Sequence, residues 1–169
     1  LGTDSSGNSN TWTVNNLVAT AGLATAAQGF DVVGYTGNGS TQSISSLAFQ
    51  PDLVWIKDRD AAYTHKLFDV IRGANKVLNS NNNSAEGTET QLLTSFDSNG
   101  FTLGNDGGLN ASGNNLVAWC WKAGGTAASN TDGTITASVS ANTTYGFSII
   151  SYTGNGTSGA TIGHGLSSA

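Results

Sequence analysis

The sequence predicts an all-β fold: an antiparallel β-sandwich or jelly roll, with a β-barrel as the alternative. Short runs of strand-forming residues alternate with Gly- and Asn-rich turns at a spacing of about 8–12 residues, which is typical of such folds. Charged residues make up only 10% of the 169 residues, while 23 residues are glycine. A helical protein would carry more Glu, Lys, Leu and Ala, and the chain lacks a convincing amphipathic helix.

The first clear strand covers residues 30–35 and ends in the turn Gly37-Asn38-Gly39. Residues 115–122, NLVAWCWK, are apolar on both faces and should form a central strand. The clearest hairpin surrounds Asn99-Gly100, because Asn-Gly accepts the positive φ that such turns require. The other expected strands cover residues 12–14, 42–47, 53–57, 66–72, 91–96, 101–103, 134–139 and 147–152.

Three segments are harder to interpret. Residues 66–72, KLFDVIR, fit a helix as well as a strand, and their β-branched content and Gly73 favour a strand. Residues 79–84 and 104–115 are rich in Gly, Asn and Ser, so we expect loops there.

An internal repeat divides the chain. Residues 29–39, GFDVVGYTGNG, return as residues 146–156, GFSIISYTGNG, with seven of eleven positions identical and an offset of 117 residues. This period is too long for a solenoid unit and fits a small domain. We therefore expect a preceding module or linker over 1–28, a complete module over 29–145 and a truncated second copy over 146–169. The truncated copy would either lack fixed structure or pair as an added strand with the first module.

The charge balance narrows the choice of partners. The net charge is −5, with 6 basic and 11 acidic residues, which argues against a nucleic-acid partner. Cys120 is the only cysteine, so the chain has no internal disulfide, and its apolar neighbours indicate a buried, unreactive thiol. An apolar stretch of about 18 residues is missing, so membrane insertion is not expected.

The order of several motifs resembles a known family. GFDVVGYTGNG is followed by PDLVWIKDR, HKLFDVIRG, SFDSNGFTLG and NLVAWCWKAG, and the series closes with NTDGTI and GFSIISYTGNG. This order resembles a repeated β-rich module in virion structural proteins of marine tailed bacteriophages. The resemblance implies a tail fibre or another protein of the particle surface, in a multidomain chain, with no known catalytic residues. The strand pattern itself suggests a lectin-like, concanavalin-A-like sandwich.

Enzymatic activity is not expected. Glycan hydrolysis needs two carboxylates that face one groove. The only glutamates, Glu86 and Glu89, are three residues apart in a loop, and this spacing does not place them on one strand face. A Gly-x-Ser-x-Gly nucleophile elbow is also missing from the sequence.

Aromatic residues are the candidates for ligand binding. Trp12, Tyr63 and His65 lie in polar stretches and are the sequence-based candidates for contact with a ligand. Trp119 and Trp121 share one face of their strand, and we expect them in the core because Leu116 and Cys120 occupy the other face. Sugar stacking on these two rings is the alternative.

Calcium is the one cofactor to consider. Asp97, Asn99 and Asp106 lie in short oxygen-rich loops of the kind that calcium uses. The same residues are those that turns require, and the chain has no complete 12-residue calcium loop. We therefore expect turns at these positions and keep calcium as a hypothesis.

These observations lead to a functional hypothesis. The chain is expected to be a non-enzymatic structural and adhesion module of a phage virion, in contact with other virion proteins or copies of itself. The alternative is a carbohydrate-binding, lectin-like receptor-binding module that contacts a host surface glycan, and a glycan depolymerase is the third option. The expected location is the virion surface.

Overall fold

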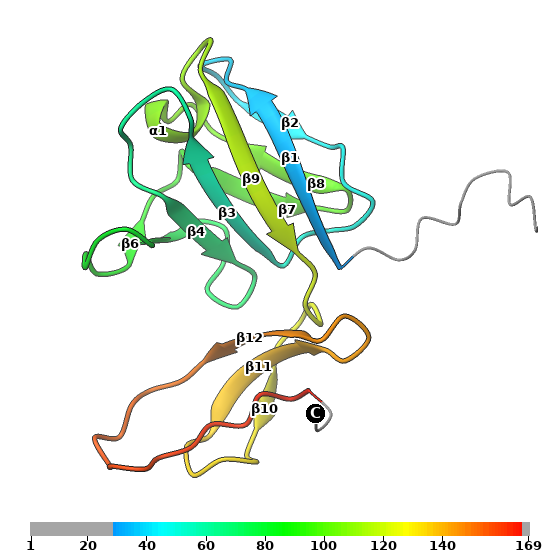
Figure 1. Ribbon diagram of the computed structural model, residues 1–169, viewed down its shortest axis with the longest axis vertical. Coiled ribbons are helices and arrows are strands. Elements are labelled where there is room, and N and C mark those ends of the chain that lie inside the picture. Colours follow the sequence, from blue (N-terminus) through cyan, green and yellow to red (C-terminus); the bar gives the residue numbers. More distant parts are fainter. Residues whose placement is uncertain (1–28, 167–169) are drawn as a thin grey trace, which may run out of the picture.

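The computed structural model describes residues 29–166, and most of the regular structure is β-strand (Figure 1). In the described part of the chain a single helical turn interrupts the strands, between β8 and β9. The elements are β1 (Phe30–Thr36), β2 (Gln42–Ile44), β3 (Leu53–Asp58), β4 (Lys66–Asp69), β5 (Lys76–Asn79), β6 (Gly87–Thr88), β7 (Leu93–Asp97), β8 (Gly100–Leu103), α1 (Gly107–Asn110), β9 (Asn115–Trp121), β10 (Ala128–Asn130), β11 (Ala137–Asn142) and β12 (Phe147–Ser151).

The strands form three antiparallel sheets. The largest has six strands in the order β1-β9-β3-β4-β5-β6, and a second has the order β2-β8-β7. Figure 1 shows β2, β7 and β8 behind β1, β9 and β3. The third sheet, β10-β11-β12, forms a separate lower layer in the same view. The prediction of an antiparallel all-β chain is therefore confirmed.

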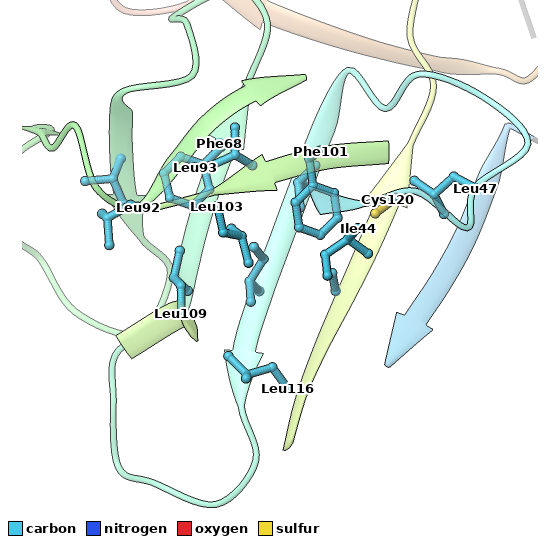
Figure 2. Close-up of a cluster of buried hydrophobic side chains, with 14 of the residues drawn as sticks. Ile44, Leu47, Phe68, Leu92, Leu93, Phe101, Leu103, Leu109, Leu116 and Cys120 are labelled. Carbon is cyan, nitrogen blue, oxygen red and sulfur yellow. The ribbon is translucent and has the colours of Figure 1, made fainter. Parts of the chain in front are cut away.

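The core lies between the six-stranded sheet and the β2-β8-β7 sheet. Strand β9 contributes Leu116 and Cys120, and the opposite sheet contributes Leu93, Phe101 and Leu103, all of them fully buried. Figure 2 shows these side chains gathered in one cluster. Because alternate residues of each strand point into this layer, the remaining residues point to the outer faces of the sheets.

A closed β-barrel, our alternative, is wrong. The six-stranded sheet begins at β1 and ends at β6, and within residues 29–166 these two edge strands do not pair with each other. Closure would require every strand to have two neighbours. The prediction of a central strand near 115–122 is confirmed, since β9 pairs with β1 on one side and β3 on the other.

Several strand boundaries differ from the sequence prediction. The strand expected over 66–72 ends at Asp69, because the Asp69 carboxylate accepts the backbone N–H groups of Ile71 and Arg72 and turns the chain. The loop expected over 104–115 contains α1, whose first turn is capped by Asp106.

The second copy of the repeat is described as far as residue 166. Its strand, β12, pairs with β11, with Asn142 opposite Phe147 and Ser138 opposite Ser151. Thus β12, the strand of the second copy, belongs to the third sheet and not to the six-stranded sheet. The expected preceding module or linker over 1–28, with its predicted strand at 12–14, lies outside the described residues.

Candidate functional site

The outer face of the six-stranded sheet carries a band of large apolar side chains. In β9, Leu116, Ala118 and Cys120 are buried, and the residues between them face outward. Pairing aligns the outward residues of neighbouring strands: Trp119 lies opposite Val32 of β1 and opposite Trp55 of β3. Nothing in the described β2-β8-β7 sheet covers this side, because that sheet packs on the opposite face.

Four aromatic side chains dominate this band, and we call them the aromatic face: Phe30, Trp55, Trp119 and Trp121. The rings of Trp55 and Trp119 have centroids 5.2 Å apart, and those of Phe30 and Trp121 are 5.0 Å apart. Phe30 is 46% exposed. Val32, beside Trp119, is 44% exposed, and the three tryptophans are half-buried. Exposed apolar surface of this kind commonly marks a contact site.

A pocket lies at one end of the aromatic face. Phe147 of β12 stacks on Trp121 at a centroid distance of 6.1 Å and an interplanar angle of 22°. Together with Phe30, Tyr145 and the backbone of Gly29, these rings line a pocket of about 370 Å³. Most small-molecule sites are concave and lined by aromatic groups, with a few polar groups that fix orientation.

The expectation that Trp119 and Trp121 belong to the core is wrong. Both side chains are only half-buried, on the face of β9 that points away from the core. The narrow layer between the two sheets is filled by Leu116, Ala118 and Cys120 instead. The sequence signal for this outward face was the two-residue spacing of the two tryptophans. The alternative hypothesis, sugar stacking on these rings, was based on that spacing.

The sequence-based ligand candidates are dispersed. His65 lies beside the aromatic face, with its ring 6.3 Å from that of Trp55. Tyr63 is 46% exposed and packs near Gly108 of α1, so it lies at a different place. Trp12 lies outside the described residues. Sequence reasoning missed Phe30 and Trp55, which only strand pairing brings next to the tryptophans of β9.

The side chains of the three calcium candidates take part in hydrogen bonds within the protein. The Asp97 carboxylate accepts hydrogen bonds from Ser95 Oγ at 2.8 Å and Thr102 Oγ1 at 2.7 Å. Asn99 donates from Nδ2 to a backbone carbonyl, and Asp106 caps α1 by accepting from a backbone N–H. Within the described ranges, His, Cys, Asp and Glu side chains do not form a group of three that could hold a metal ion.

Glu86, one of the two glutamates weighed as catalytic groups, has structural partners. Glu86 pairs with Arg72 at 3.3 Å and with Lys76 at 3.9 Å. Arg72 also binds Asp69 through a 2.6 Å contact between Nε and Oδ2. Asp69 and Glu86 therefore form an ion-pair network with Arg72 and Lys76 around β4 and β5.

The most perturbed carboxylate is Asp58, at the end of β3. Burial opposes its ionisation, but its carboxylate accepts hydrogen bonds from Asn114 Nδ2 at 2.8 Å and from the backbone N–H groups of Asp60 and Ala61. These bonds, with the nearby charge of Lys57, hold the pKa of Asp58 below its usual range.

Two core groups are held neutral. Burial raises the pKa of Tyr35 far above its usual range, and the nearby charge of Asp58 adds to this effect. Burial, assisted by Asp31, raises the pKa of Cys120 to about 12. Neither group is a candidate nucleophile, because the reactive form of each is the deprotonated one.

The fold and the site define an acidic, antiparallel β protein that presents an open aromatic sheet face. Residues 25–169 match the family model described as Domain of unknown function (DUF7483), so the chain belongs to this family. The search of curated proteins and the search of solved structures each found no match to the chain. In the described residues, the helices are too short to cross a membrane.

Proposed function

We propose that this chain is a non-enzymatic adhesion module whose aromatic face binds carbohydrate. The observation that carries the proposal is the set of four rings on adjacent strands, open on one side and ending in the aromatic pocket. Pyranose rings present an apolar C–H face that packs on such rings, while their hydroxyl groups bind polar side chains at the edge. His65 supplies a polar group at this edge.

Other ligand classes suit the face less well. Nucleic-acid bases also stack on aromatic rings, but nucleic-acid binding requires a basic surface, and this chain has a net charge of −5. A protein partner would favour a continuous apolar patch with aromatic anchors at its centre. Here the rings form two cross-strand pairs, Trp55 with Trp119 and Phe30 with Trp121, which end in a pocket and have His65 at their edge.

The finer description of the fold belongs to the same proposal. We infer that the six-stranded sheet and the β2-β8-β7 sheet form an antiparallel sandwich of the lectin-like, concanavalin-A-like or jelly-roll type. The shared core of the two sheets supports this inference. Comparison of the strand order and connections of these sheets with those of lectins and jelly rolls would decide between these types.

The biological setting that we propose is the surface of a phage particle, in a tail fibre or another appendage that contacts the host. Its support is the motif order described above. Mass spectrometry of purified particles is the test: the protein should be present in them. Detection in infected-cell lysate together with absence from purified particles would contradict this setting.

Glycan arrays test the binding proposal, with and without calcium. The wild-type chain should bind at least one polysaccharide, and Phe30→Ala or Trp119→Ala should weaken binding about tenfold or more. The matched control is Tyr152→Ala, which removes an exposed aromatic ring from outside the face. Absence of any bound glycan, or equal binding by wild type and both face variants, would contradict the proposal.

A depolymerase would leave a chemical trace. Incubation with the bound polysaccharide followed by a reducing-end assay should show no new chain ends. An increase in reducing ends above that of a heat-treated sample would replace the non-enzymatic proposal with the enzymatic one.

A further inference from the structure

Strand β12, in the second copy of the repeat, lacks neighbours that β1 has in the first copy. The difference concerns one edge of the strand and some of its side chains. Strand β12 is the last strand of its sheet, so within the described residues one of its edges is unpaired. Tyr152, just after the strand, is 53% exposed, and Ile150 is only half-buried.

The first copy shows what covers the equivalent positions. Tyr35, the counterpart of Tyr152, donates a 2.9 Å hydrogen bond from its hydroxyl to the carbonyl of Leu109. Its ring packs edge-on against Phe101 at a centroid distance of 6.3 Å. The edge of β1 pairs along its full length with β9. Thus β8, β9 and the α1 region together complete the environment of β1.

The glycines of the two turns support the same conclusion. A Cβ at Gly37 would overlap the carbonyl oxygen of Ala111, so a glycine is required there by the neighbouring chain. Gly154 is its counterpart, yet nothing lies within 4 Å of the position that its Cβ would occupy. The second copy therefore keeps both the tyrosine and the glycine without the neighbours that account for them in the first copy.

We propose that β12 and its turn are a docking strand for a second module of this fold, in which they take the place that β1 takes in the first. The partner would pair a β9-like strand with the free edge of β12 and would cover Tyr152 with a counterpart of Phe101 and Leu109. An intact first module is not the partner, because its own β1 already fills that place. The inference concerns assembly and does not depend on carbohydrate binding.

A tandem chain tests the inference. Residues 1–156 are joined directly to residues 40–169, so that the copy of residues 146–156 at the junction takes the place of residues 29–39 in the second module. The matched control joins residues 1–145 to residues 29–169 and therefore supplies the native first strand, GFDVVGYTGNG, instead. Hydrogen–deuterium exchange of the copy of residues 147–152 at the junction is compared with that of residues 147–152 in the single chain.

The expected result is a folded second module and exchange at residues 147–152 that is about tenfold slower or more than in the single chain. Tyr152→Ala and Gly154→Ala should leave the melting temperature of the single chain unchanged. In the tandem chain, the same substitutions in the junction copy should abolish the unfolding transition of the second module. A folded control with an unfolded test tandem would overturn the inference. Unchanged exchange at 147–152 in a folded tandem chain would do so too.

If neither tandem chain folds, a variant of the single chain decides. The substitutions D31S, V32I, V33I and G34S give the first copy the sequence of the second over residues 29–39. The variant should fold with a melting temperature within a few degrees of wild type, since β12 is proposed to fit the same place. Loss of cooperative unfolding in this variant would overturn the inference. None of these measurements uses a glycan, so their failure is separate from failure of the proposed function.

Discussion

Residues 29–39 and 146–156 have nearly the same sequence, the same local geometry and different surroundings. In both turns an asparagine side chain accepts a backbone N–H two residues later, at 2.8 Å in Asn38 and 2.9 Å in Asn155. The following glycines have φ values of 73° and 70°. Yet Tyr35 is enclosed beside Phe101, whereas Tyr152 is 53% exposed.

The comparison shows which structural properties depend on the residues of a short segment and which depend on the strands around it. Asx turns and positive φ values depend on residues within the turn, so they are the same in both copies. Burial depends on the strands that pack alongside, and these are β9 for the first copy and β11 for the second. The same substitution should therefore have unequal effects at the two sites.

The largest expected contrast is between the two tyrosines. Tyr35→Ala removes a ring from the core and should lower the free energy of unfolding by about 3–5 kcal/mol. Tyr152→Ala should change it by less than about 0.5 kcal/mol, because the ring is exposed. Guanidinium unfolding of both variants measures the difference. Similar losses from the two variants would show that Tyr152 is packed in solution.

The next contrast is between the glycines that precede the turn asparagines. Gly37→Ala forces a methyl group against the backbone of Ala111 and should cost about 1–3 kcal/mol. Gly154→Ala meets no atom within 4 Å and should be nearly neutral. Thermal melts of the two variants provide the comparison, and a neutral Gly37→Ala would mean that the α1 region is displaced easily.

Acid should weaken the surroundings of the first copy selectively. The pKa of Asp58 is lower in the folded chain than in the unfolded chain, so the ionised form favours folding. This contribution is fully present above the unfolded pKa of about 4 and is lost as the pH falls through the folded pKa. Asp58→Asn should cost about 1–3 kcal/mol at pH 7. The deficit should shrink as the pH falls below about 4, when measured by urea unfolding. A deficit that does not change with pH would contradict this assignment.

The smallest contrast concerns the turn asparagines. The Asn38 side-chain oxygen accepts a hydrogen bond from Asn110 Nδ2 at 3.3 Å and another from the backbone N–H of Ser40 that closes its own turn. Asn38→Ala should therefore cost about 0.5–1.5 kcal/mol, and Asn155→Ala less. Differential scanning calorimetry can resolve the two. A larger effect at Asn155 would reverse the comparison.

The sequence predicted the β class, the central position of β9 and the Asn99-Gly100 hairpin, because periodicity and turn chemistry are local signals. Its prediction that Trp119 and Trp121 lie in the core was wrong, because the covered face of β9 carries Leu116, Ala118 and Cys120. Both faces of NLVAWCWK are apolar, and only the position of the β2-β8-β7 sheet decides that Cys120 is buried and Trp119 is not.

The candidate site was harder to predict from the sequence for a related reason. Phe30, Trp55 and Trp119 come from three segments that are far apart in the chain, and antiparallel pairing aligns them. Of the three ligand-contact residues predicted from the sequence, His65 is the one that the described structure places beside this face. Pairing partners are long-range information, which a single sequence does not contain.

The enclosed thiol of Cys120 has a practical consequence. It lies in β9, between β1 and β3, is fully buried, and has a pKa raised to about 12. An alkylating reagent can reach it only when the packed layer between the two sheets opens, so the rate of labelling reports how often this core opens. As the only cysteine in the chain, it makes the wild-type protein its own kinetic probe without an introduced label.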